Sequence, residues 1–141
     1  IIAWEARTFT ATGPKVLFFG NKKDLLHIIS YEKLATEQTI VIVEDIISAI
    51  KVGRAYPALC LFGSSMDKLL LSRLKRLLGA WGEGKPHLTF WLDQDKLNDS
   101  MKYAAAAIMA GFETALVHTV SDPKFYDAPH IKATIQGVLD A

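Results

Sequence analysis

Four apolar runs constrain the fold of this chain more than any other feature. They cover residues 39–43, 58–62, 88–92 and 114–118 and are rich in β-branched, aromatic and leucine side chains. None shows a regular alternation of polar and apolar residues, which is typical of strands buried on both faces of a parallel sheet. We therefore expect a parallel sheet that is covered by helices.

Helical segments separate the four runs. Apolar side chains recur at helical spacing over residues 46–52, 66–78, 99–110 and 129–139. Asp99 or Ser100 is expected to cap the third of these helices, and glycines end the first three. The order β-α-β-α-β-α-β with short connections predicts an α/β fold with helices on both faces of the sheet.

The first 38 residues follow a different pattern. Two short strands are expected over residues 3–9 and 15–19, followed by a short helix that Asp24 caps and that carries residues 25–29. The chain has no initiator Met and opens in mid-pattern, so we expect it to be a piece of a longer protein. The expected divisions are a lead-in over 1–38 with a short β extension, a core over 39–128 and a C-terminal helix over 129–141.

Composition excludes several classes of protein. The chain has 141 residues, of which 50% are hydrophobic and 22% charged, so a folded domain is expected rather than disorder. The net charge of +1 gives no bulk attraction to nucleic acid, which would have to rely on local patches. The single cysteine, Cys60, excludes an internal disulfide and a cysteine-based zinc site, and is expected in the core. No apolar run approaches the ~18–20 residues of a membrane span, and no signal peptide is present, so a cytoplasmic location is expected.

Acidic residues follow three of the four expected strands. Ligands of open α/β sheets bind at the carboxyl ends of the strands, where Glu44, the Asp93–Asp95 pair, Asp122 and Asp127 occur. Carboxylates at the edge of a buried sheet need solvent, a partner or a cation, and clusters of them suit Mg²⁺ or Mn²⁺. In an extended segment, Asp93 and Asp95 would point to the same side and face one ion. The alternative is that these acids cap helices.

Other familiar motifs are incomplete. Residues 79–86 nearly match a phosphate-binding GxxxxGK loop, but Pro86 stands where Ser or Thr is needed, and a strand follows instead of a helix. We interpret this segment as a flexible turn. The chain has no GxGxxG dinucleotide motif, no GxSxG motif, and no metal-binding spacing among its four histidines.

Several segments together resemble the TOPRIM domain. Residues 40–50, a hydrophobic strand that ends in Glu44, resemble its first motif, and residues 88–95, a strand that ends in Asp-x-Asp, resemble its second. The Gly-Ser-Ser turn at 63–65, the acidic loop at 121–127 and the lead-in at 4–17 resemble those of DnaG-type and phage-type DNA primases. The resemblance covers roughly residues 4–130. It departs from the family pattern at Asp45, where the family usually has glycine.

The resemblance implies a Rossmann-like TOPRIM fold with a four-stranded parallel sheet flanked by helices. It also implies that Asp93 and Asp95 hold Mg²⁺ or Mn²⁺, with Asp122 or Asp127 as a further ligand, and that Glu44 either binds metal or accepts the proton of the attacking hydroxyl. The implied activity is nucleotidyl transfer from ribonucleoside triphosphates, which makes RNA primers on a single-stranded DNA template. A replicative helicase, on the same chain or on a separate one, is the implied partner.

Other TOPRIM functions remain open from the sequence. A metal-dependent nuclease shares the fold, and so does a topoisomerase domain, whose catalytic tyrosine normally lies in another domain. A non-catalytic nucleic-acid-binding module is the third alternative, and the presence of Glu44 with both aspartates of the Asp-x-Asp pair argues against it. If Glu44 and Asp93 share a metal, their strands must be neighbours, which gives the order 2-1-3-4 for the four core strands.

Template and nucleotides need cationic and hydroxyl partners. The long helix over 66–78 carries four basic residues on its polar side, with a simple solvated face as the alternative. Trp91 is expected in the core, whereas Trp81 could stack on a base. The candidates for nucleotide or DNA binding are Lys51, Arg54, Ser64, Ser65, Lys68 and Lys96.

Overall fold

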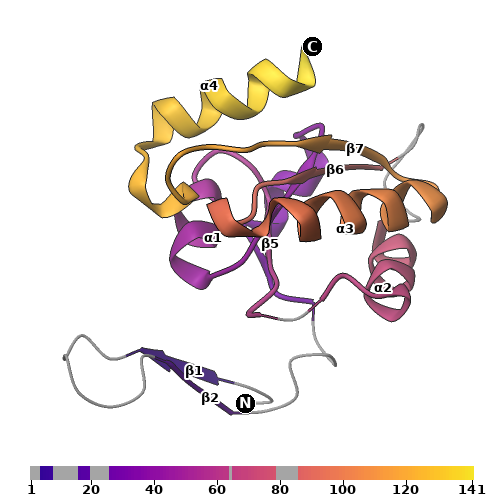
Figure 1. The fold of residues 1–141 in the computed structure, drawn as a ribbon, viewed down its shortest axis with the longest axis horizontal. Helices are drawn as coiled ribbons and strands as arrows, with labels where there is room; N and C mark the ends of the chain where they lie inside the picture. Colours follow the sequence, from indigo (N-terminus) through magenta and orange to yellow (C-terminus); the bar gives the residue numbers. More distant parts are fainter. Residues whose placement is uncertain (1–3, 8–15, 20–25, 64, 79–85) are drawn as a thin grey trace.

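The structure is a computed structural model that describes residues 4–7, 16–19, 26–63, 65–78 and 86–141 (Figure 1). Its strands are β1 (Trp4–Arg7), β2 (Val16–Phe19), β3 (Ile28–Ile29), β4 (Ile40–Val43), β5 (Ala58–Cys60), β6 (His87–Phe90) and β7 (Glu113–Leu116). Its α-helices are α1 (Ile46–Val52), α2 (Lys68–Leu78), α3 (Leu97–Met109) and α4 (Ala128–Leu139). Three short 3₁₀ helices cover Tyr31–Ala35, Gln94–Lys96 and Pro123–Phe125.

The main sheet has five strands in the order β3-β5-β4-β6-β7. Strands β5, β4, β6 and β7 run parallel to one another, in the order expected from a shared site on β4 and β6. The expectation of a four-stranded, all-parallel sheet is wrong, because β3 adds a fifth strand antiparallel to β5 and makes the sheet mixed. The sequence suggested a helix over this segment, but the backbone of residues 28 and 29 pairs with the exposed edge of β5.

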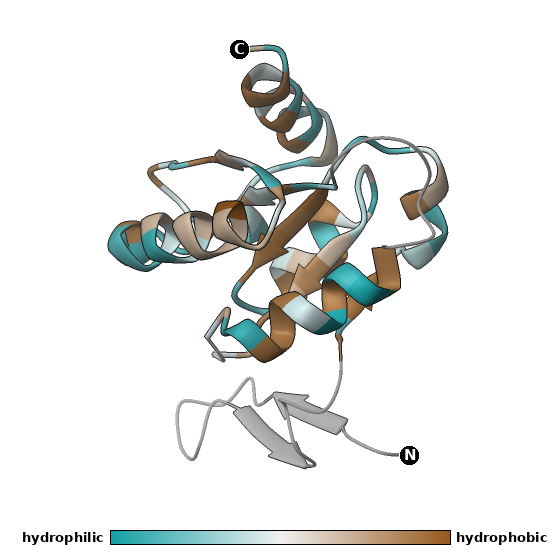
Figure 2. Ribbon diagram, turned by 90° about the vertical axis from the view of Figure 1, so that its right-hand side faces the viewer, coloured by the Kyte–Doolittle hydropathy of each residue, from teal (hydrophilic) through white to brown (hydrophobic). Residues whose placement is uncertain are grey.

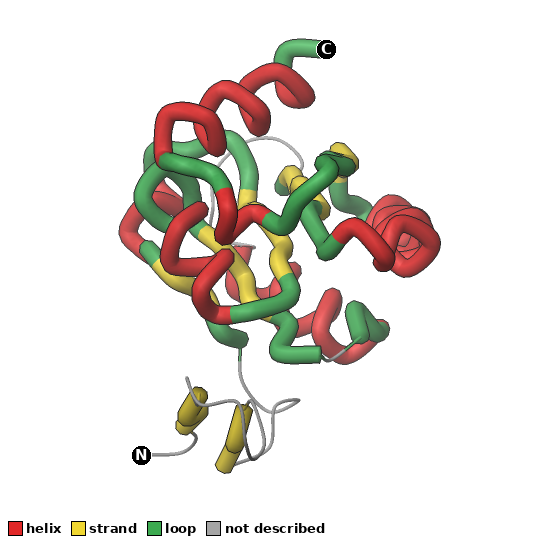
Figure 3. Tube along the Cα trace, turned by 60° about the vertical axis from the view of Figure 1, so that its left-hand side comes forward, coloured by secondary structure: helices red, strands yellow, loops and turns green. Residues whose placement is uncertain are grey.

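Helices cover both faces of the sheet, as the buried apolar runs predicted. Alternate side chains of β4 point to opposite faces. Ile40 and Ile42 belong to a core shared with α2 and α3, whereas Val41 and Val43 belong to a core shared with α1 and α4. In Figure 3 the yellow strands lie between red helices, and in Figure 2 the central strands are brown while the surrounding helices carry both brown and teal residues.

The helix positions agree closely with the apolar spacing, and the caps agree less well. Helix α1 begins after Asp45, whose side chain accepts a hydrogen bond from the Ser48 amide at 2.9 Å. The expected cap of α3 at Asp99 or Ser100 is wrong, because the helix begins earlier, at Leu97, directly after a 3₁₀ turn and without a side-chain cap. Helix α2 begins at Lys68, and the Asp67 carboxylate accepts from the Leu70 amide at 2.9 Å.

The two expected N-terminal strands are present as β1 and β2, which pair antiparallel in a separate two-stranded sheet. Several sequence-based expectations fall outside the described residues. They are the cap at Asp24, the turn over residues 79–85, the Gly-Ser-Ser serine Ser64 and the stacking candidate Trp81. Over the part of the chain that the structure describes, no helix has the length and apolar character needed to cross a membrane.

Two glycines provide a matched test of the packing between α1 and β3. A Cβ atom on Gly53 would lie 2.9 Å from the Ala49 carbonyl oxygen and 2.9 Å from side-chain atoms of Ile29 and Ser30, whereas one on Gly137 in α4 would meet nothing within 4 Å. Gly53→Ala should therefore destabilise the fold by about 1–3 kcal/mol through overpacking. Gly137→Ala should stabilise it by about 0.5–1 kcal/mol, since alanine favours a helix interior.

Urea unfolding followed by circular dichroism measures both changes. Equal effects of the two substitutions would contradict the close approach of residues 29 and 30 to the end of α1.

Candidate functional site

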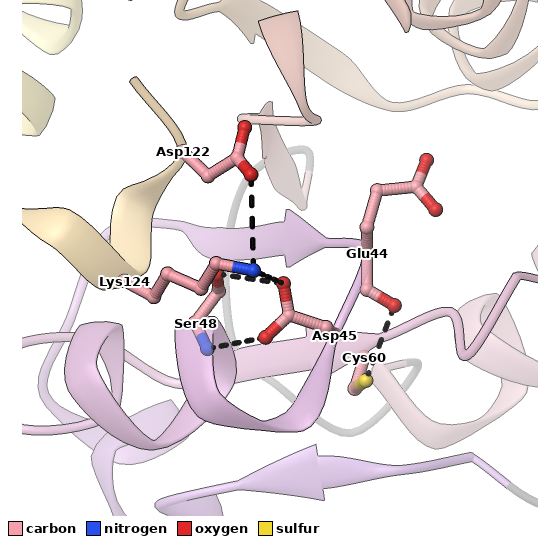
Figure 4. Close-up of polar contacts among 6 residues, drawn as sticks. All are labelled: Glu44, Asp45, Ser48, Cys60, Asp122 and Lys124. Carbon is pink, nitrogen blue, oxygen red and sulfur yellow. Dashed lines mark hydrogen bonds and ion pairs between the residues drawn. The ribbon is translucent and has the colours of Figure 1, made fainter. Parts of the chain in front are cut away.

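Glu44 and Asp93 extend the carboxyl ends of two neighbouring strands. Strands β4 and β6 pair in parallel with Ile42 opposite Phe90, so the residues that follow them emerge at the same edge of the sheet. The backbone of Glu44 is fixed by β5, because its carbonyl accepts from the Phe62 amide at 3.0 Å and from the Cys60 thiol at 3.7 Å (Figure 4). The Glu44 side chain is thereby presented at the edge from a rigid strand end.

The environment of Glu44 disfavours its charged form. The pKa of Glu44 is raised to about 7, chiefly by burial and next by the negative charge of Asp93, with smaller contributions from Asp99 and Asp95. Lys96 acts in the opposite direction and lowers the pKa of this carboxyl. A glutamate with a pKa near neutrality can take or release a proton under physiological conditions.

Asp93 carries the second perturbed carboxyl. Its pKa is raised to about 6, chiefly by burial and also by the charges of Asp122 and Asp45, whereas Lys124 acts to lower it. Its Oδ1 atom is buried without a hydrogen-bond partner among the described residues. Although Asp93 precedes the 3₁₀ helix Gln94–Lys96, its side chain makes no capping hydrogen bond. The helix-cap alternative therefore does not account for Asp93.

Asp95 does not face the same point as Asp93. The expectation that the Asp-x-Asp segment is extended is wrong, because the Lys96 amide donates to the Asp93 carbonyl at 2.9 Å and closes a 3₁₀ turn. Residues two apart in such a turn point in different directions, since each turn contains three residues. Asp95 is exposed, and its charge is the smallest of the influences on Glu44 and Asp93. Lys96 lies 4.0 Å from the Asp99 carboxylate.

Asp122 approaches the site from the loop between β7 and α4, together with a lysine. The Lys124 ammonium lies 3.9 Å from the Asp122 carboxylate and 3.9 Å from the Asp45 carboxylate (Figure 4). Asp45 is oriented by Ser48, whose amide and hydroxyl donate to its two oxygens at 2.9 and 3.1 Å. This lysine bridge joins the start of α1 to the β7–α4 loop.

The β7–α4 loop is anchored on the core through Trp91. The indole Nε1 donates to the Thr119 hydroxyl at 2.8 Å, and that hydroxyl donates to the Ser121 carbonyl at 2.6 Å. The Tyr126 ring lies 5.9 Å from the Trp91 ring, and its hydroxyl accepts from the Ser121 amide at 3.3 Å. Trp91 is fully buried, as expected from its place in an apolar run, and it fixes the loop that carries Asp122.

Asp127 lies at the start of α4 and caps that helix. Its carboxylate accepts from the His130 amide at 2.9 Å, and the residue is exposed. Its charge is not among those that shift the pKa of Glu44 or Asp93. The side chain therefore has a structural role in capping, whether or not it has another.

The candidates for nucleotide or DNA binding divide between the carboxyl and the amino ends of the parallel strands. Ser65 and Lys68 are exposed and follow β5 at the carboxyl edge, where Lys96 also lies. Helix α1 leads back to the start of β5, so Lys51 in its last turn and Arg54 beyond it lie toward the amino edge, away from Glu44.

The acidic residues that the sequence suggested as metal ligands do not all lie around one point. Within residues 26–63, 65–78 and 86–141, no group of three or more His, Cys, Asp or Glu side chains is arranged to hold a metal ion. The fold brings Asp93 close enough to Glu44 to raise its pKa. Asp122 and Asp45 lie next to Asp93 and form ion pairs with Lys124. Sequence reasoning missed Lys124, although its spacing of two residues from Asp122 was visible.

Comparison with known proteins adds no family assignment. A scan against protein-family models finds none that matches the chain, and a search of the curated proteins finds no similar sequence. The acidic edge is therefore interpreted from its own geometry and electrostatics.

The raised pKa of Glu44 makes the stability of the fold depend on pH. Between about pH 4.5 and 7 the unfolded chain releases a proton that folded Glu44 keeps, so the free energy of unfolding falls as pH rises through this window. Glu44→Gln should leave stability unchanged near pH 4 and raise it by about 1–2 kcal/mol at pH 8, after allowance for solvent screening.

Urea unfolding at the two pH values, with a chelator present, measures this difference. Glu113→Gln is the matched control, because it removes the same charge from an exposed position at the start of β7, on the opposite edge. A wild-type protein that is as stable as Glu44→Gln at pH 8 would contradict the electrostatic cost assigned to Glu44.

Proposed function

We propose that this chain is the TOPRIM domain of a DNA primase and acts through the acidic edge that follows β4 and β6. The observation that supports this proposal most strongly is the Glu44–Asp93 pair, which follows two adjacent parallel strands. Both carboxyls have a raised pKa, and the charge of Asp93 contributes to the raised pKa of Glu44. Acids that only capped helices would have hydrogen bonds to backbone amides, and Asp93 has none.

The residues present fit a divalent cation that substrate helps to bind. Two carboxyls with raised pKa values and one buried, unpartnered oxygen favour a positive charge beside them. Mg²⁺ commonly takes only one or two protein carboxylates and keeps water and substrate phosphates as its other ligands. A pair is therefore a sufficient donor set, and Asp93 with Glu44 would hold Mg²⁺ or Mn²⁺. When bound, the metal neutralises the charge that develops around phosphorus during nucleotidyl transfer.

Glu44 has two roles that its environment supports. A pKa of about 7 suits a group that accepts the proton of an attacking hydroxyl at neutral pH. The same raised pKa would fall beside a divalent cation, which suits a metal ligand. In either role the backbone of Glu44 is held at the strand end, because its carbonyl accepts from the Cys60 thiol and the Phe62 amide.

The cations near this edge suit nucleotide and template. Lys96, close enough to Glu44 to lower its pKa, is the best-placed partner for a nucleotide phosphate. Ser65 and Lys68, which follow β5, are the next candidates for phosphate or single-stranded DNA. Lys51 and Arg54 lie toward the other edge and would contact template rather than the reacting nucleotide. A replicative helicase remains the proposed partner.

Asp93→Asn is the decisive substitution for this proposal. Asparagine keeps the shape of the side chain and removes the charge, so Mn²⁺ affinity should fall at least about tenfold and ribonucleotide incorporation on single-stranded DNA should be lost. Because the carboxylate is desolvated and lacks a hydrogen bond, the variant should be as stable as the wild type or more stable. A capping acid would show the opposite, a loss of stability.

Mn²⁺ binding is followed by electron paramagnetic resonance, incorporation by labelled ribonucleotides, and stability by urea unfolding, with Glu113→Gln as the control for loss of one charge. Unchanged Mn²⁺ affinity in Asp93→Asn would reject the metal site. Metal-dependent cleavage of the DNA without primer synthesis would identify a nuclease, cleavage and rejoining a topoisomerase, and DNA binding that ignores metal a non-catalytic module.

A further inference from the structure

A lysine lies inside the acidic edge. Lys124, in the 3₁₀ helix Pro123–Phe125, is partly buried, with 27% of its side chain exposed, and its ammonium stands between the carboxylates of Asp45 and Asp122 (Figure 4). The two carboxylates are also partly buried, at 17% and 22% exposure. An ion pair with both partners shielded from solvent is screened less than one on the open surface.

The position of the ammonium is fixed from both sides. Asp45 cannot turn away from Lys124 without losing the hydrogen bonds that its two oxygens accept from Ser48 at the start of α1. On the other side, the loop that carries Lys124 is tied to the core by the Trp91–Thr119 hydrogen bond, and its 3₁₀ helix packs against α1. The lysine is therefore part of the framework of the edge.

The bridge divides the edge into two halves of different charge. On one side, the single positive charge of Lys124 offsets part of the charge of Asp45 and Asp122, and it lies close enough to Asp93 to lower the pKa of that carboxyl. On the other side, the Glu44 carboxylate points away from the bridge in Figure 4, and the Oδ1 atom of Asp93 has no hydrogen-bond partner. Neither Glu44 nor Asp93 forms an ion pair with Lys124, so a further cation would be drawn to these two carboxylates.

We propose that Lys124 is a built-in cation of this site, which takes the place of a second divalent ion and confines divalent-cation binding to a single ion beside Glu44 and Asp93. This inference rests on the proposed function, because it assumes that the edge binds a divalent cation. It assigns Lys124 a positioning role and makes Asp122 a counter-ion of the lysine rather than a metal ligand. A second divalent ion near Asp122 would have to displace the ammonium or lie against it, and like charges at that distance repel strongly.

The test counts Mn²⁺ ions bound per chain. Electron paramagnetic resonance of free Mn²⁺ should give one tight ion for the wild type and for Lys124→Arg, which keeps the charge. Lys124→Met, which keeps the length and loses the charge, should bind a second ion, and Lys124→Met combined with Asp122→Asn should return to one. Lys132→Met, on the exposed side of α4, controls for the loss of one positive charge and should bind one ion.

The outcomes separate this inference from the proposed function. One ion in the wild type and still one in Lys124→Met, or two ions in the wild type, would overturn the built-in cation and leave the metal site intact. No tight ion in the wild type would overturn the proposed metal site and this inference with it. Circular dichroism and thermal unfolding check each variant, and Lys124→Gln is a second neutral variant if Lys124→Met does not fold.

Discussion

The parallel pairing of β4 with β6 is the contact on which both the core and the candidate site depend. Each strand is buried on both faces, so the pairing joins the two halves of the core, one beneath α2 and α3 and the other beneath α1 and α4. The same register brings Glu44 and Asp93 out at one edge. A shift of one residue would exchange the two faces of a strand, so the position of the acids is fixed by the hydrophobic packing behind them.

The electrostatics of the edge follow from that packing. Two carboxyls at the end of buried strands lose hydration, and neighbouring acids add to the cost of ionising them, Asp93 for Glu44 and Asp122 with Asp45 for Asp93, so their pKa values rise. Lys124 and Lys96 offset part of this electrostatic cost, whereas the Oδ1 atom of Asp93 has no hydrogen-bond partner among the described residues. Its framework is rigid, because Asp45 is held by a helix cap and the opposite loop by the buried indole of Trp91.

The sequence predicted those features that depend on burial and little that depends on tertiary contact. The apolar runs placed β4, β5 and β6 within one or two residues, because a strand buried on both faces must be apolar throughout. They also placed β7, but the expectation that this strand is buried on both faces is wrong, because β7 is an edge strand in which Glu113 and Leu116 are exposed. Strand β3 was missed because two residues carry no periodicity, and the expected extended Asp93–Asp95 segment was missed because a local backbone hydrogen bond closes a turn. The ion pair between Lys124 and Asp45 joins residues that are far apart in sequence, so no local sequence pattern predicts it.

The unpartnered oxygen of Asp93 also has an evolutionary consequence. A carboxylate that weakens its own fold gains nothing from selection for stability, so chains released from selection for activity should lose it early, by drift to neutral residues that pack as well. Asp45 and Asp127 differ, since both cap helices and stability alone would retain them. Among sequences that share this fold, loss of Asp93 with retention of Asp45 and Asp127 would therefore mark lineages that have kept the fold and lost the activity of this site.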